Sequence, residues 1–321
     1  MGQLSQTAVP DGKRLAWPFV FAVQFDRFGA PAVLGVGEAP EPHAQPGSVR
    51  IRVEAAGVSP VDLSLRAGTS PSSARLPLPH ITGVDAAGVI DEIGDGVTGW
   101  AIGDEVFGSV DVARLGGAAA EFAVLRLWAR RPATMTWAEA GAGGTSIETA
   151  TRALDSLAAP PGATLLVDGA AGGVGSVMVQ LAIARGLRLI GAARPENRDF
   201  VAALGAEPVD AGALASLTGV DAVLDAAGAG RLAELVALAG SPDRVVTIAD
   251  FGAAAHDVHL SLGELGGQPG GRHGLAEAAA LSEAGRFRVP VQQSFPFADA
   301  ATAHEAAQTR PRRGRIALTV R

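Results

Sequence analysis

The chain has 321 residues, of which 48% are hydrophobic, and it carries a formal net charge of −7. This length and composition favour two packed domains and argue against extended disorder. The negative charge disfavours a general nucleic-acid partner or an anionic membrane surface. The chain contains no cysteine, which excludes disulfides and thiolate metal ligands.

The first residues show no targeting signal. Residues 1–18 lack the apolar core of a signal peptide, so we expect them to form an N-terminal extension. The most apolar stretch, residues 165–184, is interrupted by Asp168 and several glycines, which argues against a transmembrane helix. We therefore expect a cytoplasmic protein with no membrane partner.

Residues 19–122 carry the signals of a β-rich domain. Short runs of alternating character, separated by Gly, Pro and Asp turns, include VRIRVEAAGV (49–58), AAGVIDEIG (86–94) and DEVFGSV (104–110). The pattern then becomes helical from about Thr136 to Thr151. We place the first domain over residues 19–146.

The next segment reads as a dinucleotide-binding unit. An apolar strand at Leu165–Val167 runs into a turn of small residues, a helix follows, and a second strand passes through Leu189 and Ile190. A helix N-terminus after a glycine turn binds a phosphate through backbone N–H groups and the helix dipole. The residues that we expect to bind the cofactor here are Ala170, Gly172, Gly173, Val174 and Gly175.

The end of the second strand indicates which dinucleotide binds. NAD sites usually place an acidic residue there, but this chain has Ala192, Ala193 and Arg194, with Arg198 one helical turn later. Two guanidinium groups would suit a 2′-phosphate, which predicts NADPH as the cofactor. The alternative is a solvated surface cluster in which Glu196 pairs with one of the arginines.

Strands and helices continue to alternate, which predicts a doubly wound parallel sheet in a domain over residues 147–288. Ile248 ends the fourth strand and Asp250 follows it, at the edge where such sheets bind ligands. Residues 289–321 return to short strand-like pieces. The expected strands after Ile190 are Ala222–Leu224 and Val245–Ile248, and the expected helices are Ser176–Arg185, Arg198–Leu204 and Arg231–Leu238.

Several segments in order resemble the medium-chain dehydrogenase/reductase superfamily, in its zinc-free quinone oxidoreductase and enoyl reductase branch. They are Ala55–Gly68, Ile81–Gly108, Ala170–Ala182, Gly219–Gly228 and Gly314–Leu318. The resemblance implies an α/β protein in which a GroES-like β domain is combined with a Rossmann domain. It also implies a C-terminal return to the first domain and an active site in the cleft between the two.

The chain departs from the zinc-dependent members of that superfamily. Ser59 stands where they have a cysteine, and Gly83-Val84-Asp85 stands where they have Gly-His-Glu. The structural zinc lobe of those members needs four cysteines, which are missing here. His256 and His259 have no third ligand nearby, so we expect no metal. Conjugated carbonyls and quinones delocalise the charge that zinc would stabilise, so they suit a zinc-free reductase.

Candidates for contact with the substrate are few because the chain has no tyrosine. Ser59 is the expected catalytic group, although it could instead only cap a turn before Pro60. Ser64 and His80 are further candidates for the substrate site. Asp62 and Arg66 could orient substrate, but we expect them to form a structural pair. Solvent could also supply the proton.

The expected function is NADPH-dependent reduction of an enone, an enoyl group or a quinone, in which case the substrate could be a natural-product intermediate. The alternatives are reduction of a reactive carbonyl or imine, or a non-catalytic NADPH-binding protein. Relatives pair the edges of their Rossmann sheets, and the apolar segment Val258–Leu265 could form such an edge. We therefore expect a homodimer.

Overall fold

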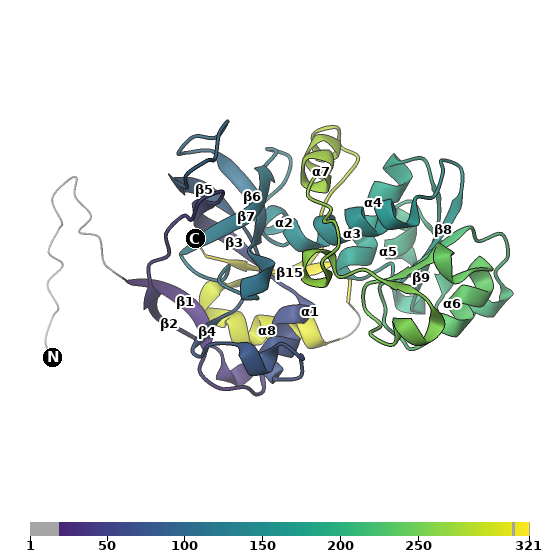
Figure 1. Cartoon of the computed structure of the whole chain (residues 1–321), viewed down its shortest axis with the longest axis horizontal. Coiled ribbons are helices and arrows are strands. Elements are labelled where there is room, and N and C mark those ends of the chain that lie inside the picture. The colour runs from purple at the N-terminus through teal and green to yellow at the C-terminus, as the bar shows by residue number, and fades with distance from the viewer. Residues whose placement is uncertain (1–18, 310–311, 321) are drawn as a thin grey trace, which may run out of the picture.

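The computed structural model describes residues 19–309 and 312–320. The expected N-terminal extension, residues 1–18, lies outside these residues. Figure 1 shows two lobes side by side, with strands β1 to β7 in one and the sheet that contains β8 and β9 in the other. Helices α2 (Trp137–Gly141) and α3 (Gly144–Leu157) lie between the lobes.

Two sheets build the first lobe. In the smaller one, β1 pairs with β2 and β4, and in the larger one the strand order is β14-β15-β3-β5-β6-β7. An additional pairing between β3 and β7 closes four of these strands into a ring. The strands are β1 (Phe19–Phe25), β2 (Gly35–Pro40), β3 (Val49–Val58), β4 (His80–Ile81), β5 (Asp85–Ile93), β6 (Glu105–Val110), β7 (Phe122–Arg130), β14 (Val291–Pro296) and β15 (Arg315–Thr319).

The C-terminal strands belong to this first lobe. β15 pairs antiparallel with β3, with Ile316 opposite Val58. Alternate residues of β3, such as Ile51 and Val53, are fully buried, as expected of a strand with one face on a core. Helices α1 (Pro60–Ala67) and α8 (Ala300–Gln308) complete the lobe.

The second lobe is a parallel sheet of order β10-β9-β8-β11-β12-β13. Every residue of β8 is buried, because helices cover both faces of a doubly wound sheet. The short strand β13 forms one edge of the sheet, inside the segment expected there. The strands are β8 (Thr164–Asp168), β9 (Arg188–Ala193), β10 (Glu207–Asp210), β11 (Ala222–Asp225), β12 (Val245–Thr247) and β13 (His259–Leu260).

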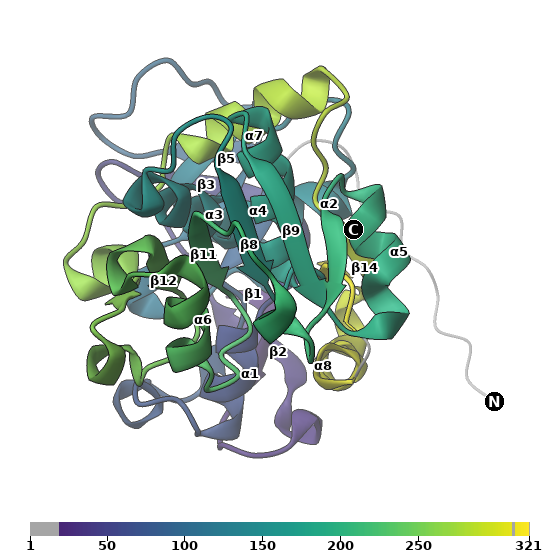
Figure 2. The same ribbon diagram turned by 90° about the vertical axis from the view of Figure 1, so that its right-hand side faces the viewer.

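Alternation along β8 separates two cores. Leu165 and Val167 pack into the core shared with α3, α4 and α7, whereas Leu166 packs on the opposite face with residues of α6. Figure 2 shows the sheet with helices around it. The GroES-like and Rossmann α/β architecture is therefore confirmed. The remaining helices are α4 (Gly173–Ala184), α5 (Arg198–Ala203), α6 (Leu232–Ala239) and α7 (Gly274–Glu283).

The helical region expected over residues 136–151 consists of two helices, because the chain turns between Gly141 and Gly144. Both glycines lie against strands: a Cβ on Gly141 would come 2.5 Å from the carbonyl oxygen of Ala55, and one on Gly144 would come 2.3 Å from that of Gly108. The absence of side chains at these two glycines therefore lets the segment between α2 and α3 pack closely against the strands of the first lobe. Within the described residues, no helix is both long and apolar enough to cross a membrane.

Candidate functional site

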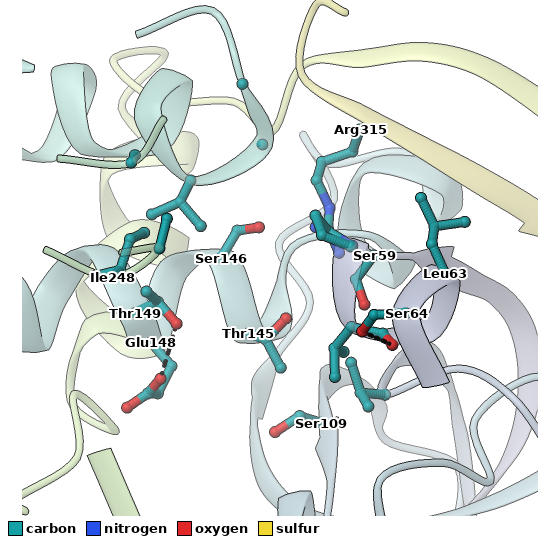
Figure 3. Close-up of a pocket in the computed structure, with 18 of the residues that line it drawn as sticks. Ser59, Leu63, Ser64, Ser109, Thr145, Ser146, Glu148, Thr149, Ile248 and Arg315 are labelled. Carbon is teal, nitrogen blue, oxygen red and sulfur yellow. Dashed lines mark hydrogen bonds between the residues drawn. The ribbon is translucent and has the colours of Figure 1, made fainter. Parts of the chain in front are cut away.

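A cavity of about 840 Å³ is lined by residues of both lobes. The first lobe contributes α1 and the ends of β3 and β6, and the second contributes the turn before α4 and the residues after β12. Figure 3 shows hydroxyl side chains of α3 between these two groups of residues. The cavity is large enough for part of a dinucleotide together with a small substrate.

The glycine turn after β8 forms one wall of the cavity, where Gly169 and Gly172–Gly175 line it. Gly169 has a φ of +84°, which favours glycine, and it accepts a hydrogen bond from the N–H of Gly172 at 2.9 Å. A Cβ on Gly175 would lie 2.2 Å from the Gly169 oxygen, so the helix packs against its own turn.

The turn has the shape that a pyrophosphate needs. A Cβ on Gly172 would meet only the Gly169 oxygen, at 3.3 Å, because the residue faces the cavity. The first N–H groups of α4 lack intrahelical acceptors and lie at the positive end of its dipole. Ala170 is fully buried in the core behind the turn and does not line the cavity. These residues fit a dinucleotide phosphate.

Arg194 follows the carboxyl end of β9 and Arg198 begins α5, and both are exposed. Within the described part of the chain, neither arginine forms an ion pair, so Glu196 does not neutralise either of them. The surface cluster considered above therefore does not form. The two guanidinium groups are outside the lining of the cavity and remain available to a ligand phosphate that reaches the end of β9.

Ser59 lines the cavity at the first turn of α1. Its hydroxyl donates to a carboxylate oxygen of Asp62 at 2.7 Å, and its backbone N–H donates to the same oxygen at 2.7 Å. The other oxygen of Asp62 accepts from the N–H of Gly83 at 3.1 Å. Burial raises the pKa of Asp62, while these hydrogen bonds lower it. Ser59 is the N-cap residue of α1, and the capping bonds that the structure shows are those that Asp62 accepts from it.

The expectation that Asp62 and Arg66 form a structural pair is wrong. The backbone of Ser59 and Gly83 holds the carboxylate of Asp62, and the guanidinium of Arg66 donates to the carbonyl of Gly29 instead. Ser64 lines the cavity as expected, but its hydroxyl donates to the carbonyl of its own helix at Val61, at 3.0 Å.

His80 lies away from the cavity lining. Its Nε2 is 3.1 Å from the carbonyl oxygen of Leu115, and its ring packs against Phe25 with 5.5 Å between centroids. Burial lowers the pKa of this histidine. His80 therefore positions Leu115, which does line the cavity, and it has no direct contact with the space where a substrate would lie.

The two residues expected after β12 differ in their placement. Ile248 lines the cavity, together with Ala249 and the 73% exposed Phe251. Asp250 does not line it, and its carboxylate accepts from the N–H of Gly252 at 2.8 Å. Asp250 thus shapes the loop that presents its neighbours.

A buried ion pair that the sequence analysis missed lies within the first lobe beside the cavity, and it also binds the helices between the lobes. Arg315 of β15 donates to Asp85 of β5 at 2.7 Å, and its Nε donates to the carbonyl of Ala142 at 2.9 Å. Thr145 donates to Asp85 through its N–H at 2.6 Å and its hydroxyl at 2.7 Å. Burial raises the pKa of Asp85 to about 6, although Arg315 and Thr145 oppose the shift.

The residues at the zinc-ligand positions of the zinc-dependent members do not form a metal site. Val84 is an apolar core residue, and the carboxylate of Asp85 is committed to Arg315 and Thr145. Among the residues that the structure describes, no three His, Cys, Asp or Glu side chains lie together in a way that could hold a metal ion.

Two family models match the chain. One is the "Alcohol dehydrogenase GroES-like domain", over residues 45–130, and the other is the "Zinc-binding dehydrogenase", over residues 199–318. The second model is named for zinc binding, although the positions discussed above carry no metal ligands in this chain.

Among curated proteins, a quinone oxidoreductase of Rattus norvegicus is 38% identical over 180 residues, which is 55% of this chain and 53% of that protein. A 2-methylene-furan-3-one reductase of Solanum lycopersicum is 37% identical over 148 residues, which is 44% of this chain and 38% of that protein. The matched region thus spans about half the length of such relatives, or less. Among solved structures, an alcohol dehydrogenase superfamily protein of Novosphingobium aromaticivorans is 31% identical, with a TM-score of 0.82 over 94% of this chain and 100% of that one.

Proposed function

Because this chain belongs to the medium-chain dehydrogenase/reductase superfamily, we propose that it is an NADPH-dependent reductase of conjugated C=C bonds or quinones. The observation that carries the proposal is a cavity in which a glycine turn at a helix N-terminus faces the hydroxyl-bearing and apolar residues of the first lobe. Two relatives are named for a quinone and for a 2-methylene-furan-3-one, in which a C=C bond is conjugated with a carbonyl.

The residues that line the cavity indicate which part of it would bind the cofactor and which part the substrate. The cavity side of the turn at Gly172–Gly175 would hold the pyrophosphate of a dinucleotide. A reduced nicotinamide bound there supplies a hydride. Apolar residues of the first lobe, such as Val58, Leu63 and Val84, would exclude water around the conjugated system of the substrate. Arg194 and Arg198 would favour the 2′-phosphate of NADPH over NADH.

We propose that the reaction needs no zinc. The hydroxyl of Ser59 is directed to Asp62, and Val84 and Asp85 cannot complete a zinc site in their present roles. Conjugated carbonyls need only hydrogen-bond donors for the charge that develops on oxygen. Dialysis against a strong chelator should therefore leave turnover unchanged.

The test is NADPH oxidation, followed by absorbance, with a panel of enones, quinones, aldehydes and imines, each repeated with NADH. The proposal expects turnover of at least one conjugated carbonyl or quinone, with lower KM for NADPH than for NADH. Turnover restricted to aldehydes or imines would replace it with a carbonyl or imine reductase. NADPH binding without turnover of any compound would favour a non-catalytic binding protein.

We also propose that two copies associate through the edge of the parallel sheet at β13. The unpaired side of an edge strand invites pairing, and Leu265, shortly after β13, is 58% exposed. Light scattering should give the mass of a dimer at micromolar concentration, with backbone amides of residues 258–265 protected from hydrogen exchange. A monomer with rapid exchange in this segment would refute the dimer.

A further inference from the structure

Several hydroxyl side chains line the cavity, and Figure 3 shows them on α1, β6 and α3 around a common space. A hydroxyl can stabilise negative charge on a substrate oxygen only if its proton is free to be donated there. The protein partners of each hydroxyl therefore decide which of them can serve. The hydroxyl residues labelled in the figure are Ser59, Ser64, Ser109, Thr145, Ser146 and Thr149.

Most of these hydroxyls already donate to the protein. Ser59, Ser64 and Thr145 donate as described above, two of them to buried carboxylates and one to a helix carbonyl. Thr149 donates to a carboxylate oxygen of Glu148 at 3.2 Å. A substrate oxygen would have to displace these acceptors, and displacing a buried carboxylate would leave it short of a hydrogen bond.

Ser146 differs from these residues. It is fully buried, and its hydroxyl has no hydrogen-bond partner anywhere in the described part of the chain. The residue lines the cavity, and Figure 3 shows it between Ile248 and Ser59 with its hydroxyl directed toward the side of Ser59. A buried hydroxyl without an acceptor costs free energy of folding. Its presence here therefore indicates that a bound ligand provides the acceptor.

The surroundings of Ser146 favour a negatively charged acceptor. The residue lies in the first turn of α3, a helix of 14 residues whose N-terminal end carries partial positive charge. Arg315 also lines the cavity, although its charge is shared with Asp85. The chain thus places an unpartnered O–H group at the positive end of a helix, in the wall of the cavity.

We propose that the hydroxyl of Ser146 donates the hydrogen bond that stabilises the substrate oxygen during hydride addition, which rests on the reductase function proposed above. The C4–H bond of a reduced nicotinamide would break, leaving the oxidised ring, and its hydride would form a new C–H bond at the β-carbon. The π electrons of the C=C bond shift toward the carbonyl, and the carbonyl π pair moves onto oxygen, where the O–H group of Ser146 donates. A solvent proton then adds to the α-carbon and restores the carbonyl.

Ser109 provides the sharpest comparison. It is buried, it lines the cavity, and its hydroxyl has no partner among the described side chains and backbone groups. It lies on β6 and not at a helix N-terminus. If burial and freedom of the hydroxyl were sufficient, loss of Ser109 should matter as much as loss of Ser146. The inference predicts that only Ser146 carries the effect.

The first experiment compares Ser146→Ala, Ser109→Ala and Ser156→Ala, the last removing an exposed hydroxyl from the same helix outside the cavity. Loss of one oxyanion donor should lower kcat about 10²–10³-fold in Ser146→Ala, with a much smaller change in KM. Ser156→Ala should match the parent protein. Thermal unfolding of Ser146→Ala should occur at the same temperature as the parent or higher, because the lost hydroxyl has no protein acceptor.

The second experiment measures binding without turnover. 4-Nitrophenol is titrated into the protein saturated with NADP⁺, and its absorbance reports ionisation of the bound probe. The parent protein should bind the phenolate and lower its pKa, and Ser146→Ala should bind the phenolate at least about 10-fold more weakly while binding the neutral phenol equally.

The two experiments separate the inference from the function on which it rests. If no compound in the panel is reduced, the reductase function fails, and the phenolate titration still decides the role of Ser146. Equal phenolate binding by the parent and Ser146→Ala, no phenolate binding by the parent, or a loss in Ser109→Ala as large as that in Ser146→Ala would each overturn the inference.

Discussion

Replacement of Arg315 by methionine should destabilise the protein strongly while keeping most of the aliphatic side chain. Arg315 is 5% exposed and Asp85 is fully buried, and the pair joins β15 to β5 across 230 residues of sequence. Loss of the guanidinium would leave the carboxylate of Asp85 with only the two donors of Thr145. Removal of one partner of a buried ion pair typically costs about 3–5 kcal/mol.

The cost should depend on pH. Burial raises the pKa of Asp85 from its ordinary value of 3.8 to about 6 in the folded protein, so its ionised form is disfavoured by folding. Such a group lowers stability as pH rises from about 4 through the folded pKa. Arg315 opposes this rise in pKa, so Arg315→Met should extend the window to higher pH. The variant should therefore be less destabilised near about pH 5, where Asp85 can be protonated, than near about pH 8.

The assay is equilibrium unfolding in urea of the parent, Arg315→Met, Asp85→Asn and the double variant at both pH values. The double variant should lose less than the sum of the single variants, because neither buried group is then left with an unsatisfied charge. A cost below about 1 kcal/mol for Arg315→Met, as for an exposed salt bridge, would refute this reasoning. So would strict additivity of the two substitutions.

The remaining predictions concern the cofactor and one buried histidine. Arg194→Ala should reduce the preference for NADPH over NADH by on the order of 2 kcal/mol in binding, and equal affinities in the parent protein would contradict the assignment. Gly172→Val should abolish NADPH binding in calorimetry because its side chain would enter the phosphate position, and unchanged affinity would refute that placement. His304 is fully buried, and burial lowers its pKa from 6.5 to about 3, so its stabilising contribution is lost as pH falls below about 6.5. Between about pH 8 and about pH 5 the parent should therefore lose about 2 kcal/mol more stability than His304→Leu, and parallel stability curves would contradict this.

Local patterns were sufficient to predict the parallel sheet and the phosphate turn. Apolar strands, glycines and helical spacing follow one another between β8 and β9, so neighbours in sequence determine the structure there. The start of α4 was misplaced to Ser176 because Gly173 and Gly175 suggest a turn, whereas the fold uses both in the first turn of the helix.

The chemistry of the first lobe was harder to predict because it depends on distant partners. The spacing of Asp62 and Arg66 suggests a helical ion pair, but the N–H of Gly83, which is remote in sequence, donates one of the hydrogen bonds that hold the carboxylate of Asp62. His80 suggested a polar site residue, and its ring is directed to the carbonyl of Leu115 instead. The free hydroxyl of Ser146 could be recognised only after the acceptors of the other hydroxyls were known.

The most direct test of the central claim is transfer of deuterium from C4-labelled NADPH to the product. Mass spectrometry and NMR of the reduced enone should show one deuterium at the carbon β to the carbonyl, delivered from one face of NADPH only. If NADPH binds but no enone, quinone, aldehyde or imine yields a labelled or reduced product, the chain is not a reductase of these compounds.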